Sequence, residues 1–318
     1  MMPAPPVRRR PRILLTNDDG IEAAGLRHLA AGLATKYELL VVAPAEERSG
    51  TGPALTLRRE VFYRRYRLPV GSEAFAVEGT PGDCVVFGLS RPGEPVRAVV
   101  SGVNQGANRG HDVLISGTVG AALQAFFAGV PAMAVSLATV EHPIWGPAVR
   151  AAQALVPALL THRPPLLLNV NLPNFPARRI KGVVAATMGQ RSFHELVEDT
   201  SADEGRASFR ILRTRSEVEA PVGSDVWAVR QGYVAVTPLH VDLTAGTELP
   251  RVGELCGRLE RRLWPGRSVS RQLADGSGPR NGVGEVLGVP TNLVGTAGPH
   301  PDPLPKGEGM SARRKGGG

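Results

Sequence analysis

The sequence has little cysteine. Only two of its 318 residues, Cys84 and Cys256, are cysteines, and they lie far apart in the chain. This excludes a disulfide scaffold and a zinc site with four cysteine ligands, and it is typical of proteins of the reducing cytoplasm. No stretch of 18 residues is both apolar and uncharged, and no apolar run of signal-peptide length follows the basic N-terminus. We therefore expect a cytoplasmic protein without a transmembrane helix.

Aromatic residues are also scarce, at 5% of the chain, although hydrophobic residues make up 42%. A core of useful size must therefore consist mainly of alanine, valine and leucine. At roughly 150 residues per domain, the length allows about two domain-sized units.

Excess charge is absent from the middle of the chain. The net charge is +8, but residues 13–261 contain 25 basic and 25 acidic residues, so the excess lies in the two ends. A nucleic-acid-binding protein usually carries a basic stripe on its folded domain. We therefore expect neither specific nucleic-acid binding nor membrane binding.

Composition divides the chain into three parts. Residues 1–11 form a short basic tail, which we expect to be disordered. The last 57 residues contain 13 glycines and 7 prolines, a level typical of low-complexity chain. The sequence therefore predicts a folded domain at 12–262, followed by a disordered tail at 263–318.

Within this domain, short apolar runs alternate with segments that have helical periodicity. Helices are expected at 21–33 and 119–128, and strands at 12–16, 38–43, 97–101, 132–136 and 166–171. This alternation predicts an α/β fold with a mostly parallel sheet covered on both faces. Polar alternating stretches at 208–212 and 226–229 predict β-hairpins within about 183–240, protruding as an arm for a partner subunit.

Two adjacent carboxylates follow the first predicted strand. Asp18 and Asp19 stand in the sequence TNDDG at 16–20. Ligands bind at the carboxyl ends of parallel strands, and neighbouring acids repel each other unless a cation lies between them. Such hard oxygen ligands suit Mg²⁺ or Mn²⁺. The alternative is that one aspartate only caps the following helix.

A loop rich in glycine and hydroxyl groups follows the second predicted strand. Ser49 and Thr51 alternate there with Gly50 and Gly52. Such a loop can approach a metal or a phosphate closely. The alternative is an ordinary surface loop, since many such loops have a similar composition.

The segment 101–120 is the most informative. It reads SGVNQGANRGHDVLISGTVG, with Asn104, Asn108 and Asp112 spaced by four residues. Its many glycines predict a long structured loop after the strand at 97–101. Ser116-Gly117-Thr118 then opens an apolar helix, whose first backbone N–H groups form an anion site suited to phosphate. An ordinary N-cap would explain Thr118 but not the loop before it.

A cation site beside a phosphate site points to a metal-assisted phosphoryl hydrolase. Other common sites are missing from the sequence: there is no GxxxxGK[ST] phosphate loop, no GxGxxG after the first strand, no GxSxG and no HExxH.

Four motifs, in this order, resemble those of the survival protein SurE family, and the resemblance covers roughly residues 12–262. They are TNDDG at 16–20, APxxxRSGxG at 43–52, GTPxDCV at 79–85 and SGVNxGxNxGxD…SGTVGAA at 101–122.

The resemblance implies a Rossmann-like, doubly wound fold with a projecting C-terminal hairpin that assembles a homodimer or homotetramer. It implies one divalent cation per subunit, held by Asp18, Asp19, Ser49 and Asn104. It also implies hydrolysis of nucleoside 5′- and 3′-monophosphates, and of short polyphosphate by some members.

We expect a cation-activated water to attack the phosphorus, with one of the two aspartates also orienting that water. The residues expected to bind the substrate and its phosphate are Asn17, Gly50, Asn108, Ser116, Gly117 and Thr118. Two alternatives remain. One is an aspartyl-phosphate phosphatase with Asp18 as nucleophile, although position 20 is glycine where such enzymes have a second aspartate. The other is a nucleotide-binding protein without turnover.

Overall fold

The computed structural model describes residues 10–190, 193–203, 206–215 and 219–264. The two predicted tails, at 1–11 and 263–318, lie almost entirely outside these residues. The strands are β1 Arg12–Thr16, β2 Glu38–Pro44, β3 Tyr63–Arg67, β4 Glu73–Val77, β5 Val96–Gln105, β6 Ala132–Ala138, β7 Leu167–Pro173, β8 Val183–Ala185, β9 Phe193–Asp203, β10 Arg206–Arg215 and β11 Val234–Pro238. The α-helices are α1 Ala24–Leu33, α2 Pro81–Leu89, α3 Gly117–Phe127, α4 Trp145–Thr161, α5 Asp225–Arg230 and α6 Leu249–Leu263.

The described residues form a nine-stranded central sheet with the order β3-β4-β2-β1-β5-β6-β7-β11-β8. All neighbouring strands from β4 to β7 run parallel, whereas β3 pairs antiparallel with β4, and β11 with β7. The predicted α/β fold with a mostly parallel sheet is confirmed. All five predicted strands are present.

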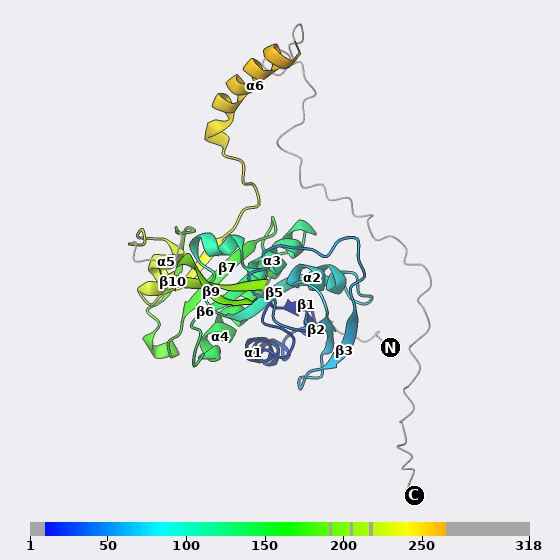
Figure 1. The fold of residues 1–318 in the computed structure, drawn as a ribbon. Coiled ribbons are helices and arrows are strands. Elements are labelled where there is room, and N and C mark those ends of the chain that lie inside the picture. The colour runs from blue at the N-terminus through cyan, green and yellow to red at the C-terminus, as the bar shows by residue number, and fades with distance from the viewer. Residues whose placement is uncertain (1–9, 191–192, 204–205, 216–218, 265–318) are drawn as a thin grey trace, which may run out of the picture. The chain divides into compact units, whose positions relative to one another are not determined.

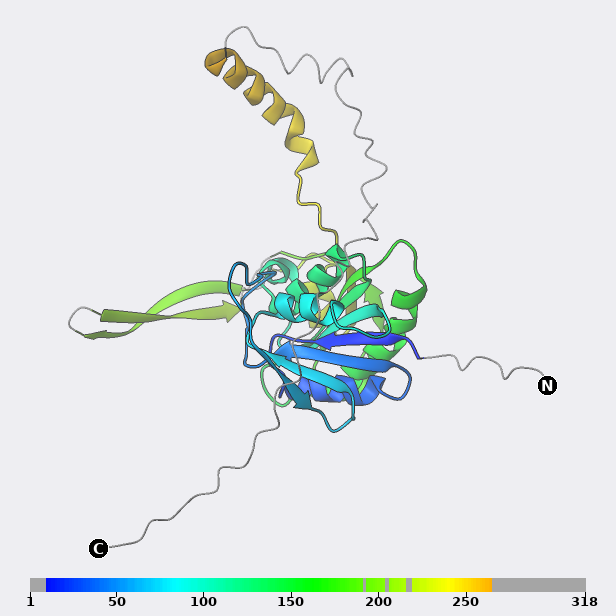
Figure 2. The same ribbon diagram turned by 90° about the vertical axis from the view of Figure 1, so that its right-hand side faces the viewer.

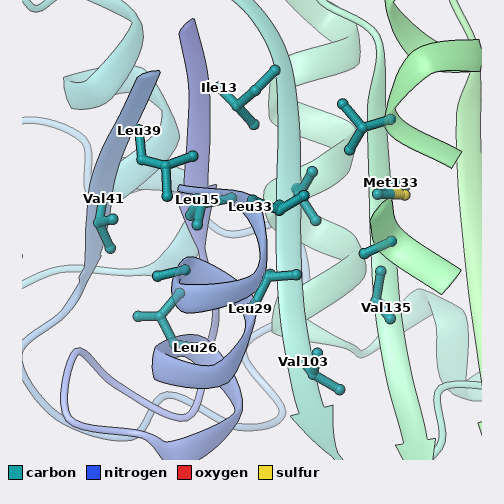
Figure 3. Close-up of a cluster of buried hydrophobic side chains, with 14 of the residues drawn as sticks. Ile13, Leu15, Leu26, Leu29, Leu33, Leu39, Val41, Val103, Met133 and Val135 are labelled. Carbon is teal, nitrogen blue, oxygen red and sulfur yellow. The ribbon is translucent and has the colours of Figure 1, made fainter. Parts of the chain in front are cut away.

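Helices cover both faces of this sheet (Figure 1). Helices α1 and α4 lie on one face, and α2 and α3 lie on the other. On α1, Leu26, Leu29 and Leu33 recur at helical spacing and are fully buried. Figure 3 shows them directed at the strands, where they meet side chains such as Ile13 and Leu15. Because both faces are covered, the inner strands carry continuous apolar runs rather than alternating ones.

The start of the predicted loop at 101–120 differs from the structure. The segment 101–105 belongs to strand β5, which continues to Gln105, so the long loop begins only at Gly106. Polar residues such as Ser101 and Asn104 are buried there, and a polarity pattern cannot distinguish a buried polar strand end from a loop. The loop also contains a 3-10 turn, η1, at Gly110–Leu114.

The predicted hairpin is confirmed in β9 and β10, which pair with each other and form a separate two-stranded sheet. Figure 2 shows this hairpin extending away from the central sheet. The predicted strand at 226–229 is wrong, because these residues form helix α5. Ser224 caps α5 by accepting a hydrogen bond from the Trp227 N–H, and this local signal overrides the apolar alternation.

Helix α6 belongs, from Pro250 onward, to a second unit of the chain. None of its residues is buried. Apolar residues recur along it at helical spacing, and arginines occupy positions between them. These apolar residues are Leu249, Val252, Leu255, Leu259 and Leu263.

Candidate functional site

The carboxyl ends of the central parallel strands bring three segments together at one edge of the sheet. Residues 17–20 follow β1, residues 45–52 follow β2, and residues 106–115 follow β5 and lead into α3. β1 lies between β2 and β5 in the sheet, so these segments are neighbours. This is where an open parallel sheet places its ligands.

The two adjacent acids contact different neighbours at this edge. Asp18 is only 4% exposed, and its Oδ1 accepts a hydrogen bond of 2.5 Å from the Thr118 hydroxyl at the start of α3. Asp19 is partly buried and accepts a hydrogen bond from the Gln105 backbone at the end of β5. Neither acid is the N-cap of α1, which is Ala23. The capping alternative therefore does not account for the pair.

Burial opposes the negative charge of both acids. Burial, together with the neighbouring charges of Asp18 and Glu47, raises the pKa of Asp19 to about 7. Burial also raises the pKa of Asp18, although the hydrogen bond from Thr118 acts in the opposite direction. No ion pair among the described residues includes either acid. A pair of desolvated carboxylates without a basic partner fits a divalent cation, which would balance this charge.

Backbone hydrogen bonds hold the loop after β2 beside the acid pair and the start of α3. The Arg48 N–H donates to the Asp18 carbonyl at 2.7 Å, and the Gly52 N–H donates to the Ile115 carbonyl at 3.0 Å. Ser49 is exposed, and its hydroxyl donates to a Glu47 carboxylate oxygen at 2.8 Å. Ser49 thus lies on the loop beside the acid pair, with its side chain turned to Glu47.

Helix α3 approaches Asp18 and the loop after β2 so closely that only glycine fits at two of its positions. A Cβ on Gly117 would lie 2.8 Å from the Asp18 Cβ and 2.9 Å from its Oδ2. A Cβ on Gly120 would lie 2.3 Å from the Gly52 carbonyl oxygen. Ser116 caps the helix by accepting from the Val119 N–H at 3.2 Å. The N-terminus of α3, which is suited to bind an anion, therefore directly contacts Asp18, which is suited to bind a cation.

The two asparagines of the loop motif have different surroundings. Asn104 is 8% exposed at the end of β5, and its amide donates to the Gly106 carbonyl at 2.7 Å. The Asn108 amide donates to the Ser136 hydroxyl at 2.9 Å and to the Thr118 hydroxyl at 3.5 Å. Its backbone carbonyl accepts from the amides of Asn169 and Asn171. Asn108 thus connects β6 and β7 to the start of α3, behind Thr118.

Asn17 and Gly50 complete the set of predicted residues. Asn17 is fully buried, and its amide donates to the Gly20 carbonyl at 2.8 Å, which closes the turn after β1. Its Oδ1 has no hydrogen-bond partner among the described residues. Gly50 has a positive φ of 75° and open space around it. Gly50 therefore shapes the loop through its backbone.

Sequence reasoning missed two acids that organise this region. Glu47 acts electrostatically on both Asp18 and Asp19, but in the sequence it is one charged residue of an ordinary loop. Asp225 is fully buried, and its carboxylate accepts from the N–H groups of Gly110 and Gly189. The sequence predicts a hairpin strand beside it, at 226–229, and nothing local signals that Asp225 contacts a loop 115 residues away.

The chain resembles known proteins over most of its length. The sequence profile of the family described as "Survival protein SurE" matches residues 13–195. A "5′-nucleotidase SurE" of Synechococcus sp. (strain JA-3-3Ab) is 43% identical over 240 residues, which are 73% of this chain and 93% of that protein. A "5′-nucleotidase SurE" of Aeromonas hydrophila is 42% identical over 251 residues, 76% of this chain and 97% of that protein.

A solved structure is similar as well. The crystal structure of the SurE protein from Aquifex aeolicus superposes with a TM-score of 0.66 at 32% sequence identity. The match covers 77% of this chain and 99% of that one. The similarity therefore extends over the fold of nearly the whole Aquifex chain.

Proposed function

Because the chain belongs to the survival protein SurE family, we propose that it is a metal-dependent 5′-nucleotidase, which hydrolyses nucleoside 5′-monophosphates to nucleoside and phosphate. Curated relatives at about 40% identity carry the name 5′-nucleotidase SurE, which supports this activity. The observation that carries the proposal is the contact between Asp18 and the start of α3. Nucleoside 3′-monophosphates and short polyphosphate are proposed as further substrates.

We propose that one Mg²⁺ or Mn²⁺ ion binds to Asp18, Asp19, Ser49 and Asn104. The carboxylate, hydroxyl and amide oxygens of these side chains are hard ligands of the kind these ions prefer. Among the described residues no cluster of three or more His, Cys, Asp or Glu forms a different metal site. When bound, such an ion polarises a phosphoryl group and lowers the pKa of water.

Residues of the chain itself bind the phosphate and orient the groups around it. The Thr118 hydroxyl fixes the Asp18 carboxylate, so this acid keeps one orientation. The first N–H groups of α3, at Gly117 and Thr118, bind phosphate oxygens, where the helix dipole favours negative charge. Asn108 is proposed to hold a phosphate oxygen as well, and its amide lies next to the Thr118 hydroxyl, at 3.5 Å. One of the two aspartates also orients the attacking water.

We further propose that the β9–β10 hairpin assembles a homodimer or homotetramer. Large apolar side chains are exposed on it, which is unusual for a surface without a partner. Val197 and Ile211 face each other across the two strands and are 69% and 59% exposed. Leu196 and Phe209 are more than half exposed as well.

A cytoplasmic location is proposed from the thiols. Cys84 is buried, Cys256 is exposed, and both are free. Free thiols are typical of a reducing compartment. No helix in the described part of the chain is long and apolar enough to cross a membrane.

The activity is tested by measuring the phosphate released from AMP in the presence of Mn²⁺. Asp18→Asn and Asp19→Asn should each lower kcat/KM by more than the roughly 10–100-fold that loss of an outer-shell partner of a metal costs. Asp242→Asn, a change of the same type at an exposed aspartate, serves as the matched control and should keep full activity. Full activity of either site variant, or of the wild type in excess EDTA, would contradict the metal role.

A further inference from the structure

Exposed arginines are concentrated on β3, the end strand of the central sheet, and on the residues just before it. Within ten residues, the chain carries five exposed arginines and one acid, Glu60. We name these arginines the arginine strip: Arg58, Arg59, Arg64, Arg65 and Arg67. The strip gives residues 58–67 a net charge of +4, although residues 13–261 as a whole are neutral. The average over the domain therefore conceals a local concentration of positive charge.

These arginines are not neutralised by acidic side chains. No ion pair among the described residues includes a member of the strip. Glu73 lies directly opposite Arg67 in the β3–β4 register, but its carboxylate accepts from Arg12 Nη2 at 2.7 Å. Glu22 accepts a hydrogen bond from the Tyr66 hydroxyl instead. The strip thus presents guanidinium groups without acidic partners to the solvent, although that of Arg64 lies over the Tyr66 ring, 5.9 Å from its centroid.

The strip lies beside a cavity and exposed aromatic rings. Strand β3 is the end strand of the sheet, and a cavity of about 550 Å³ lies along β3 and β4, lined by Arg65, Tyr66, Arg67 and Glu73 among others. Phe62 is 63% exposed and takes part in no ring contact among the described residues. Tyr63 is half exposed, although its ring also packs on Phe87.

We propose that the arginine strip binds single-stranded nucleic acid without sequence specificity. Proteins that bind such strands combine a basic groove for the backbone with aromatic side chains on which bases stack. Here the guanidinium groups would contact phosphates, and Phe62 and Tyr63 would stack on bases. Charged residues on an end strand also prevent pairing with other sheets. That role needs no exposed aromatic rings, so it leaves Phe62 unexplained.

One end of the strip lies near the carboxyl ends of the sheet strands, where the proposed catalytic site is. Tyr63 pairs with Val77 at the carboxyl end of β4, the same edge of the sheet as the acid pair. Residues 53–62 connect β3 to Gly52, which contacts Ile115 and α3. A strand bound along the strip would therefore run from this edge down β3. The binding itself does not depend on the proposed nucleotidase activity.

The test is fluorescence anisotropy of the full-length protein with a labelled 20-nucleotide oligo(dT) that has hydroxyl groups at both ends. Such a probe lacks the terminal phosphate that the proposed catalytic site would bind, and EDTA in the buffer prevents its hydrolysis. Arg64→Gln/Arg65→Gln/Arg67→Gln should weaken binding about tenfold or more at low salt. The slope of log K against log salt should fall by about 2, at roughly 0.7 per phosphate contact.

The matched control is Arg258→Gln/Arg261→Gln/Arg262→Gln, which removes the same charge from exposed positions of α6 and should bind within about twofold of the wild type. Arg58→Gln/Arg59→Gln, outside the strand, repeats the test where β3 pairing is untouched. Phe62→Ala should weaken binding about fivefold or more, because base stacking on aromatic rings contributes that much.

Three outcomes would overturn the proposal. The first is wild-type binding by both strip variants while the α6 control loses affinity. The second is no measurable binding of the probe to the wild-type protein. The third is unchanged binding by Phe62→Ala together with equally strong competition by polyphosphate, which would make the strip a general polyanion surface.

Discussion

At the scale of single residues, the proposed cation site depends on the electrostatics of two neighbouring acids. Asp18 and Asp19 are held away from water, beside each other and beside Glu47. In the cation-free protein their charges oppose folding, and a bound cation would remove this opposition. Stability and ligation are therefore linked at these residues.

The first prediction concerns pH and stability in EDTA. The pKa of Asp19 is about 7 in the folded protein, against about 3.9 for an unfolded aspartate. The folded state therefore binds this proton more tightly, so its stabilising contribution is complete below about pH 4 and is lost as the pH rises through 7. Between pH 5 and 8 the wild type should lose about 2–3 kcal/mol more of its free energy of unfolding than Asp19→Asn loses.

Chemical denaturation at both pH values measures this difference, with Asp242→Asn as the control that follows the wild type. At pH 8 in EDTA, we expect Asp19→Asn to be more stable than the wild type. Adding Mn²⁺ at this pH should make the wild type the more stable protein. An identical pH dependence in the wild type and in Asp19→Asn would rule out the electrostatic account.

The second prediction concerns Gly117. Alanine favours helices by about 1 kcal/mol over glycine, but at position 117 its Cβ would meet the Asp18 side chain. Gly117→Ala should therefore displace α3 or Asp18 and lower AMP hydrolysis about 100-fold, as a 1 Å misplacement can. Gly253→Ala in α6, where a Cβ meets nothing within 4 Å, is the matched control and should keep its activity. Equal activity of the two variants would argue against close contact between α3 and Asp18.

At the scale of secondary-structure elements, features with a local sequence pattern can be predicted, whereas contacts between residues far apart in the chain cannot. The strands β1 and β2 are predictable because buried parallel strands carry continuous apolar runs. The acids after β1 and the glycines of α3 are equally visible as local patterns. The contacts of Asp225, and the charge that Glu47 adds, depend on residues brought together only by the fold. The sequence predicts a strand at 226–229 instead of helix α5, because so short an apolar alternation fits a short helix as well as a strand.

The third prediction concerns the base of the hairpin. Arg213 on β10 forms an ion pair with Asp112, which is buried in η1, and a second one with Glu195 on β9. Arg213→Ala leaves the Asp112 carboxylate buried without this partner, so it should lower the free energy of unfolding by about 2 kcal/mol. Arg210, on the same strand, forms an exposed ion pair with Glu198. Arg210→Ala should lower the free energy of unfolding by at most about 1 kcal/mol. Urea denaturation of both variants measures the difference, and equal losses would mean that the hairpin base does not hold η1.

At the scale of the whole molecule, the proposed assembly and the proposed site are separate properties. The hairpin extends away from the central sheet (Figure 2), whereas the acid pair follows β1 at the carboxyl ends of the sheet strands. A change at the apolar surface of the hairpin should therefore alter the oligomeric state without changing the contacts between Asp18 and α3.

The fourth prediction tests this separation. In Val197→Lys/Ile211→Glu, opposite charges replace two exposed residues that face each other, so the hairpin itself is preserved. Light scattering coupled to size-exclusion chromatography should find a smaller assembly than the wild type forms. Leu243→Lys, at an exposed apolar residue outside the hairpin, should leave the assembly unchanged. An unchanged mass of the double variant would exclude the hairpin as the assembly surface.

The most direct test of the central claim is calorimetric titration of Mn²⁺ into the metal-free protein. We predict one ion bound per chain in the wild type and in Asp242→Asn, and a loss of affinity greater than about 100-fold in both Asp18→Asn and Asp19→Asn. Unchanged affinity in both site variants would contradict the claim that these neighbouring acids bind the cation at the start of α3.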